Sequence, residues 1–116
     1  MTNKKNLGRI GEELAASFLK KNGFEIIRRN FRYKKIGEID IILKRDDLIV
    51  FVEVKSRNSS CFGGPLYSIN KRKIKTLRIV ANQFLILNTE YLSFRCRFDM
   101  ISVQNGKIEW IEDIFR

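Results

Sequence analysis

The segment LIVFVEVK, residues 48–55, holds the features that decide the fold of this 116-residue chain. It begins with an apolar run rich in Ile and Val, which predicts a buried β-strand. Glu53 and Lys55 then follow two positions apart, so their side chains share one face of that strand. Charged groups are costly on a buried strand. The segment therefore predicts both a central strand and a candidate site.

The segment GEIDIILK, residues 37–44, predicts the preceding strand of the same hairpin. A hairpin centred between Asp46 and Asp47 has a register that the turn fixes. That register places Asp40 directly opposite Glu53. The pairing is the same for a loop of two or four residues, whereas a three-residue loop would break it.

This register predicts a metal site between the two strands. Opposed side chains in an antiparallel pair have Cβ atoms ~4.5–5.5 Å apart, so Asp40 and Glu53 repel each other unless a cation lies between them. Mg²⁺, or Mn²⁺ in its place, takes such oxygen ligands together with a substrate phosphate. The same register places Glu38 opposite Lys55, whose ammonium can orient the attacking water or offset charge on the phosphate. These groups meet the needs of phosphodiester hydrolysis.

An ion pair is the other interpretation of the same residues. In it, Glu53 or Asp40 pairs with Lys55 or Arg57, and no metal binds. The position of two carboxylates opposite each other in an apolar hairpin favours the metal site, because ion pairing alone does not explain why both are there.

The remaining periodicities predict an α/β domain spanning residues 1–116, with an αβββαβ order and a mixed central sheet flanked by helices. Asn6 is the expected N-cap of the first helix. A strand, a helix and a strand in the second half predict a parallel crossover. The predicted helices cover residues 7–22 and 70–88, the strands 24–32, 37–44, 48–56, 93–103 and 107–111, and a loop 57–68.

The charge of the chain indicates a polyanionic partner. Lys and Arg number 23 against 13 acidic residues, which gives a net charge of +10. Two basic clusters and an acid-free stretch between Glu53 and Glu90 favour nucleic acid over a merely solvated surface. No segment has the pattern of a membrane-surface helix. The expected nucleic-acid contacts are Arg32, Lys34, Lys35, Arg57, Lys71, Arg72 and Lys73.

Composition excludes several kinds of chemistry. The chain has no histidine, so Ser-His-Asp catalysis and histidine-based zinc sites are absent. Cys61 and Cys96 form no C-x-x-C motif, and the N-terminus has no apolar signal region. The longest apolar run is far shorter than the ~20 residues of a membrane helix. We therefore expect a cytoplasmic protein with two reduced thiols.

A few single residues have a limited interpretation. Glu12 lies at the edge of the apolar face of the first helix, where it either reaches the sheet or remains solvated, while Glu13 points more nearly to solvent. Asp99 lies between arginines and is expected to pair with them. Tyr33, Phe62 and Tyr67 are candidates for stacking on unpaired bases, and Phe24, Phe31, Phe51, Phe84 and Phe98 are expected in the core.

An ordered set of motifs covers nearly the whole chain: GRIGEELAA (residues 8–16), GF (23–24), NFR (30–32), GEID (37–40), VFVEVKSR (50–57), FG (62–63), Lys73 and RFDMI (97–101). This set resembles the YraN-like bacterial family. The resemblance implies a restriction-endonuclease-like fold, similar to archaeal Holliday junction resolvases, with a D…E-x-K active-site pattern. It implies Asp40, Glu53 and Lys55 as catalytic positions and Glu12 as a helix carboxylate at the metal. Ser68 departs from the family, which often has Ala there.

The sequence therefore leads us to expect a Mg²⁺- or Mn²⁺-dependent endonuclease that hydrolyses DNA, with branched or otherwise structured DNA as a candidate substrate. Fold-level analogy does not establish the substrate. A nucleic-acid-binding module with a degenerate site is the alternative, and a basic scaffold protein of a ribonucleoprotein is a third. A homodimer would suit the cutting of two strands, although no residue demonstrates one.

Overall fold

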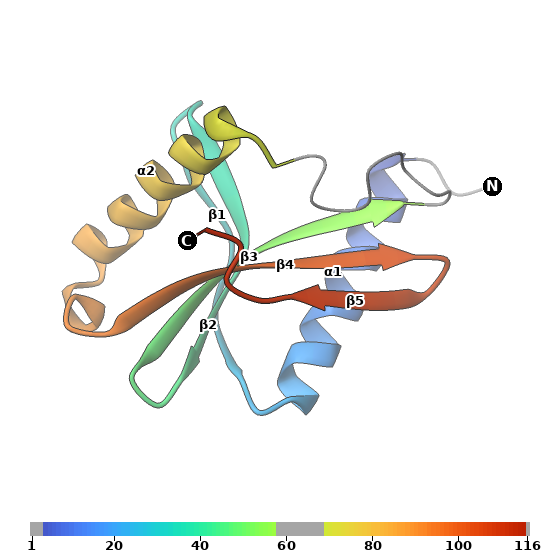
Figure 1. The fold of residues 1–116 in the computed structure, drawn as a ribbon, viewed down its shortest axis with the longest axis horizontal. Helices are drawn as coiled ribbons and strands as arrows, with labels where there is room; N and C mark the ends of the chain where they lie inside the picture. The colour runs from blue at the N-terminus through green and yellow to red at the C-terminus, as the bar shows by residue number, and fades with distance from the viewer. Residues whose placement is uncertain (1–3, 58–68, 116) are drawn as a thin grey trace.

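The computed structural model describes residues 4–57 and 69–115, which form an α/β fold (Figure 1). The predicted order of elements is confirmed. The helix α1 begins at Lys4, so Asn6 lies inside it. The expectation that Asn6 is its N-cap is therefore wrong. The elements are α1 (Lys4–Lys21), β1 (Glu25–Tyr33), β2 (Gly37–Arg45), β3 (Leu48–Arg57), α2 (Lys71–Leu87), the 3₁₀ turn η2 (Thr89–Tyr91), β4 (Arg95–Gln104) and β5 (Lys107–Ile111).

The strands form one mixed five-stranded sheet in the order β1-β2-β3-β4-β5. Neighbouring strands are antiparallel except β3 and β4, which are parallel. The parallel pair is the one that α2 connects, as the strand-helix-strand pattern predicted. The loop expected at 57–68 lies outside the described residues, apart from Arg57 at the end of β3.

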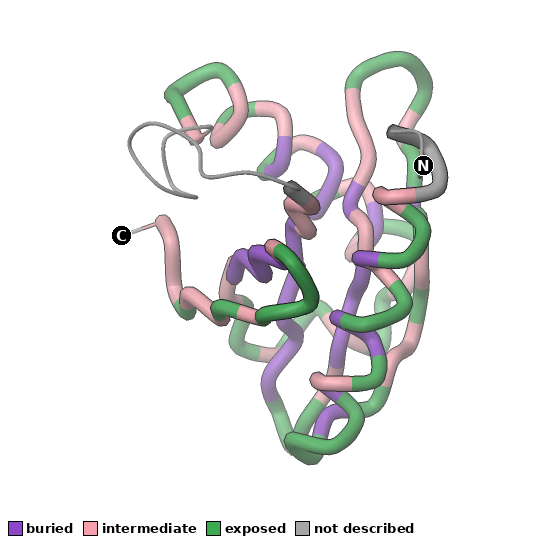
Figure 2. The backbone as a smooth tube through the Cα atoms, turned by 90° about the vertical axis from the view of Figure 1, so that its right-hand side faces the viewer, coloured by how far each residue is buried: buried purple, intermediate pink, exposed green. Residues whose placement is uncertain are grey.

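The two helices lie on opposite faces of the sheet, so the chain has two apolar cores. Figure 2 shows buried backbone concentrated in the strands between the helices. On the α1 side, Ala15 and Leu19 pack with the β3 residues Val50 and Val52. On the α2 side, the buried residues include Leu77, Val80, Ala81, Phe84, Ile49 and Phe51. The alternation of side chains along β3 supplies both cores, because it is buried on both faces.

A glycine brings α1 close to the carboxyl-terminal half of β3. Gly11 lies so near Ser56 that a Cβ atom at position 11 would overlap the Ser56 side chain. Close approach of this kind requires glycine. It also holds the next residue of the helix, Glu12, near the end of the β2–β3 hairpin.

The alternation of side chains along β2 changes at Asp40. Ile41 packs in the core under α1, whereas both Ile42 and Ile39 pack in the core under α2. Strict alternation would place Ile39 with Ile41. On the neighbouring strand, Asn30 has a φ of 52°, the left-handed conformation that asparagine tolerates better than most residues. This irregularity occurs beside Asp40.

The second helix begins with a side-chain cap. The side chain of Asn70 accepts a hydrogen bond from the Lys73 backbone N–H at 2.9 Å, which satisfies one free donor of the first turn. The cap fixes the start of α2 and hence the position of Lys73. Neither described helix is long and apolar enough to cross a lipid bilayer. Cys96 is a free, exposed thiol.

Candidate functional site

Asp40 lies where β2 and β3 stop pairing. The ladder runs from Arg45 and Leu48 to Ile41 and Val52, which is the register that a turn at Asp46 and Asp47 predicts. At the next position, the Asp40 Oδ2 atom accepts a hydrogen bond from the backbone N–H of Val54 at 2.8 Å. The carboxylate therefore takes the place of a β2 main-chain carbonyl as the acceptor for β3, beside Glu53.

Glu38 has a different partner from the one the register suggested. The β2–β3 ladder ends before it reaches Glu38 and Lys55. Glu38 instead pairs with Arg32 on β1, with 3.2 Å between Arg32 Nη2 and Glu38 Oε2. The expected opposition of Glu38 and Lys55 is therefore wrong, because β2 and β3 separate after Ile41.

Glu53 is buried on the α2 side and has two lysines beside it. Its side chain is 7% exposed, and its Oε1 atom lies 3.1 Å from Lys73 Nζ and 3.8 Å from Lys55 Nζ. Lys55 comes from the same strand, two residues on, whereas Lys73 comes from the first turn of α2. The structure thus brings Asp40, Glu53 and Lys55 to one end of the hairpin, but the ladder ends at Ile41 and Val52 and does not include the direct Asp40–Glu53 pair that the register suggested.

The electrostatics of Asp40 set it apart among the carboxyl groups. Burial first, and then the charge of Glu53, raise its pKa to about 7, against the hydrogen bond from Val54, which lowers it. A carboxyl group whose pKa approaches neutrality has too little positive charge or hydrogen bonding around it to stabilise the ionised form. A cation at this position would supply that stabilisation.

Glu12 points toward the same region from α1. Partial burial raises the pKa of Glu12, while the charge of Arg29 lowers it, and the nearby Glu38 and Glu53 raise it. Glu13 is exposed and pairs with Arg29 at 2.7 Å. The sequence left open whether Glu12 reaches the sheet. It lies within electrostatic reach of the site.

The carboxylates do not form a complete cage for a metal ion. Within residues 4–57 and 69–115, no group of three or more acidic or cysteine side chains lies in an arrangement that could hold one. However, Mg²⁺ typically binds through one or two carboxylates and the phosphates of its substrate. Asp40 and Glu53 are hard oxygen donors, and the high pKa of Asp40 shows uncompensated negative charge. This donor pair fits such an ion.

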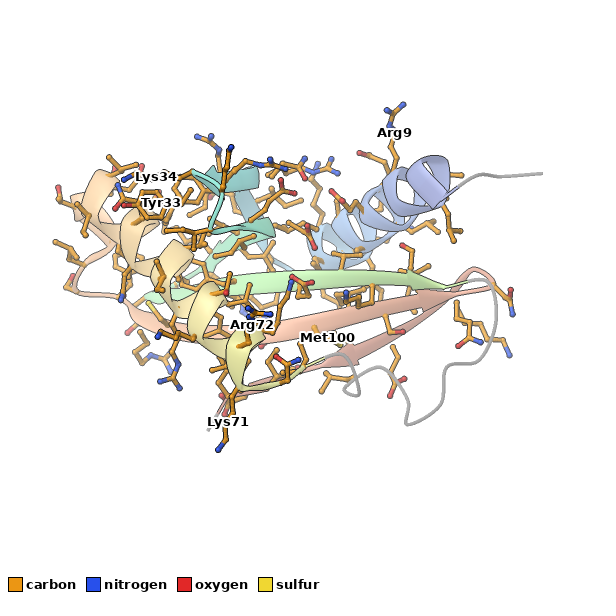
Figure 3. The ribbon with its side chains drawn as sticks, turned by 90° about the horizontal axis from the view of Figure 1, so that it is seen from above. Arg9, Tyr33, Lys34, Lys71, Arg72 and Met100 are labelled. Atoms are coloured by element: carbon orange, nitrogen blue, oxygen red, sulfur yellow. The ribbon has the colours of Figure 1, made fainter. Side chains whose placement is uncertain are left out.

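The two basic clusters are exposed on different elements of the fold. Lys34 and Lys35 are exposed in the turn between β1 and β2, and Lys71 and Arg72 are exposed at the start of α2. In Figure 3, Lys34 lies well apart from Lys71 and Arg72, so the clusters are two separate patches. The exposed Arg32 is paired with Glu38.

Several expected contacts lie beyond what the structure describes. The backbone of Arg57 pairs with Gln104 of β4, but the Arg57 side chain lies outside the described part. The stacking candidates Phe62 and Tyr67 also lie outside it, as does Cys61. Tyr33 is half-buried, with Lys34 Nζ 5.2 Å from the centre of its ring.

Lys73 has a partner that the sequence did not suggest, because its ammonium pairs with the buried Glu53 carboxylate. The expected contact of Lys73 with phosphate stays a prediction. Sequence periodicity gave no sign of this contact, since the residues are 20 positions apart and belong to different elements. The N-cap residue Asn70 is a local feature from which the start of α2, and hence the first turn that carries Lys73, could have been predicted.

The geometry defines a class of protein: an α/β domain with paired carboxylates and lysines at the open end of a central hairpin. Residues 11–103 match the family described as "Uncharacterised protein family UPF0102". The chain belongs to this family.

Relatives from distant bacteria match over almost their full length. A UPF0102 protein of Caldicellulosiruptor bescii is 44% identical, over 97% of this chain and 99% of its own. A UPF0102 protein of Shewanella denitrificans is 38% identical, over 93% and 97%. One from Brachyspira hyodysenteriae is 40% identical, over 99% of both chains. These matches agree with the YraN-like resemblance of the sequence motifs.

Proposed function

We propose that this protein is a metal-dependent endonuclease that hydrolyses phosphodiester bonds of DNA. The observation that supports the proposal most strongly is the position of Asp40. It is a half-buried carboxyl group beside Glu53, its pKa is raised to about 7, and it lies at the open end of a hairpin that also carries Lys55. A purely structural carboxylate would have partners that favour its ionised form.

The donor pair of the site suits Mg²⁺ or Mn²⁺. When bound, such an ion provides positive charge for the phosphate oxygens and makes the attacking water more acidic. Asp40 and Glu53 would hold the ion through carboxylate oxygens. Glu12, on the facing helix, would add a contact to the ion or to its waters.

Lysine supplies the remaining charge. Lys55 lies 3.8 Å from Glu53 and is about one-third exposed, so its ammonium can reach a phosphate or hold the water that attacks it. Lys73 balances the charge of Glu53 before a cation binds. Once the cation takes over that balance, the Lys73 ammonium is available to a phosphate oxygen.

The two basic patches would hold the DNA on either side of this centre. They are exposed, and the chain carries a net charge of +10. Phosphate contacts by Lys34, Lys35, Lys71 and Arg72 would make binding depend steeply on salt. We propose branched or otherwise structured DNA as the substrate, by analogy with Holliday junction resolvases and the restriction-endonuclease-like fold that the sequence motifs resemble. Such an enzyme would act in the cytoplasm.

One observation favours a second function, a nucleic-acid-binding module with a degenerate site. Lys73 lies 3.1 Å from Glu53, so the Glu53 charge is already balanced without a metal ion. A module of this kind would bind DNA through the same basic patches. The binding-module interpretation does not explain the high pKa of Asp40, and we therefore favour the nuclease.

One experiment separates the two functions. Wild type, Asp40→Ala and Lys55→Ala are incubated with linear, nicked and four-way-junction DNA in Mg²⁺, Mn²⁺ or EDTA, and binding is measured in parallel. The nuclease predicts metal-dependent cleavage that both substitutions abolish while DNA binding persists. Binding without cleavage of any substrate supports the module, and a wild type that neither binds nor cuts excludes both.

A further inference from the structure

The sheet has a polar face that α2 does not cover. The helix packs mainly on β1 and β2 and on the first half of β3, where Ile49 and Phe51 lie. The second half of β3 and the β4–β5 hairpin extend beyond it (Figure 1). On the other face of these same strands, Val54, Ile101, Val103, Ile108 and Trp110 pack in the core under α1. Alternation therefore directs their neighbours to the side of the sheet on which α2 lies, beyond the end of that helix.

From the position of Lys55 onward those neighbours are polar, whereas the adjacent pair Met100 and Ile111 is apolar. Lys55 is paired with Ser102 of β4, and Ser102 is paired with Glu109 of β5. Two residue pairs further along, on the same face, Gln104 is paired with Lys107. Adjacent strands lie ~4.8 Å apart, so this polar row leads from Lys55 directly across the hairpin.

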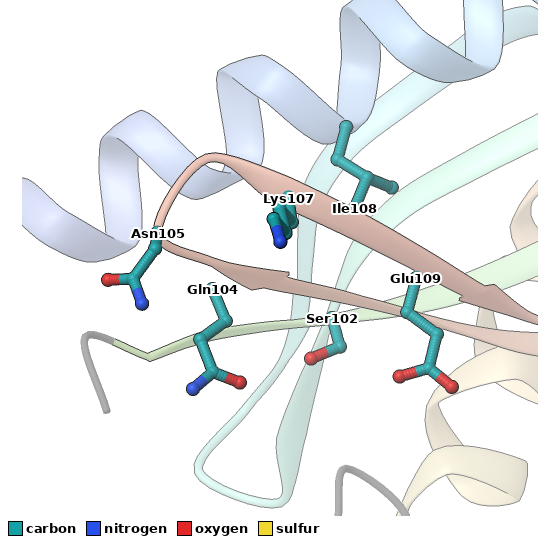
Figure 4. Close-up of a pocket in the computed structure, with 6 residues that line it drawn as sticks. All are labelled: Ser102, Gln104, Asn105, Lys107, Ile108 and Glu109. Carbon is teal, nitrogen blue, oxygen red and sulfur yellow. The ribbon is translucent and has the colours of Figure 1, made fainter. Parts of the chain in front are cut away.

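The row encloses a hollow of about 440 Å³. The described residues that line it are Ser102, Gln104, Asn105, Lys107, Ile108 and Glu109. Figure 4 shows Ser102, Gln104 and Glu109 pointing to the same side of the hairpin, and Ile108 pointing the opposite way. Ser102 is 6% exposed and is the most buried of the polar residues that line the hollow.

We propose that this hollow holds one unpaired nucleotide of the substrate strand, next to the phosphodiester that is cleaved. The proposal rests on the proposed function in placing that phosphodiester at Lys55. The hollow is of the size of small-ligand sites, ~300–1,000 Å³, and is too small for a duplex. It therefore favours a strand whose bases are unpaired beside the cut.

The lining chemistry fits a nucleotide. Amide and carboxylate side chains such as Gln104 and Glu109 form hydrogen bonds with base edges, and a carboxylate accepts from the amino group of cytosine or adenine. Thymine offers no amino group. Lys107 is exposed at the rim, where its ammonium can bind a backbone phosphate.

Two substitutions test the nucleotide site. Glu109→Gln keeps the shape but removes the charge, and Gln104→Trp fills the hollow. The control is Glu90→Gln, the same change of charge at an exposed position in η2. Binding of fluorescent single-stranded oligo-dC and oligo-dT is measured in EDTA, and cleavage kinetics are measured in Mg²⁺. Circular dichroism and thermal unfolding confirm that each variant is folded.

We expect wild type to prefer oligo-dC over oligo-dT, and Glu109→Gln to reduce that preference about fivefold to tenfold. Gln104→Trp is expected to raise KM about tenfold with less change in kcat, because it removes binding common to substrate and transition state. The control leaves both properties unchanged.

The two proposals fail in different ways. If Asp40-dependent cleavage occurs but Gln104→Trp and Glu109→Gln behave like Glu90→Gln, the nucleotide site is excluded and the nuclease stands. If wild type cleaves no DNA and Glu109→Gln still reduces the preference for oligo-dC, the nuclease is excluded and the nucleotide site is supported.

Discussion

Asp40 and Asp99 are carboxylates in the same sheet whose surroundings differ. Asp99 is fully buried and accepts four hydrogen bonds, each of 2.9 Å: two from the Arg97 guanidinium, one from Trp110 Nε1 and one from the Asp113 backbone N–H. For Asp40, the hydrogen bond from Val54 is opposed by burial and by the charge of Glu53.

The difference separates a structural carboxylate from a functional one. Asp99 ties β4 to β5 and to the segment after it, and its partners satisfy it within the protein. Asp40 lacks that compensation, and its charge is available to a ligand. Buried polar groups are normally satisfied, so an under-compensated one beside a second carboxylate indicates a site for a cation.

The largest expected effect is on catalysis at Asp40. Asp40→Asn removes one anionic ligand but retains an oxygen that can accept from Val54. We expect DNA cleavage to fall by about 10³-fold, because the transition-state charge loses its cation. The matched substitution Asp99→Asn should retain cleavage in the fraction that folds. Equal loss of specific activity in both folded variants would remove the distinction between the two carboxylates.

The next effect is on stability at Asp99. Asp99→Ala leaves the Arg97 guanidinium, the Trp110 indole N–H and the Asp113 N–H without their acceptor. Breaking a buried ion pair in this way costs about 3–5 kcal/mol. Urea unfolding measures the loss, with Asp47→Ala as the control, since the Asp47–Arg95 pair is exposed. Similar losses in both variants would contradict a structural role specific to Asp99.

A smaller effect concerns the pH dependence of stability. The folded protein raises the pKa of Asp40 from 3.8 to about 7, so it binds a proton more tightly than the unfolded chain does. The stabilisation from this group is therefore present below about pH 4 and is lost as pH rises to about 7. Asp40→Asn removes this loss, and its free energy of unfolding at pH 8 should exceed that of wild type by roughly 2–4 kcal/mol. If wild type were as stable as Asp40→Asn at pH 8, or more stable, the raised pKa of Asp40 would be contradicted.

The smallest effect concerns Lys73. Lys73→Ala removes an ammonium that competes with a cation for Glu53, so Mn²⁺ affinity measured by calorimetry should rise about fivefold, or ~1 kcal/mol. The control is Lys75→Ala, an exposed lysine of the same helix. Weaker Mn²⁺ binding in Lys73→Ala alone would show that Lys73 supports the metal site rather than competing for it.

Local sequence patterns predicted most of the fold and part of the candidate site. The order of helices and strands, the β2–β3 register and the proximity of Asp40 to Glu53 follow from apolar periodicity and from the Asp46-Asp47 turn. The pairing of Asp99 with Arg97 also followed from their proximity in sequence. These features depend on contacts within a few residues or across one hairpin.

The features that sequence analysis missed depend on longer-range geometry. The change of alternation at Asp40 occurs beside Asn30, whose backbone is in the left-handed conformation. The apolar periodicity of the sequence does not predict this change. The pairing of Lys73 with Glu53 depends on how α2 returns to the sheet. The polar row at Ser102 and Gln104 was overlooked because it continues the face that carries the apolar Phe98 and Met100 earlier in the same strand.

The ionisation of Asp40 itself is the most direct test of the central claim, which is that its charge is uncompensated until a cation binds. Its side-chain carbon is followed by NMR through a pH titration, with and without saturating Mg²⁺. We predict a pKa of about 7 without the ion and a value well below 7 with it. A pKa near the ordinary 3.8 without the ion, or no change when Mg²⁺ is added, would contradict the account.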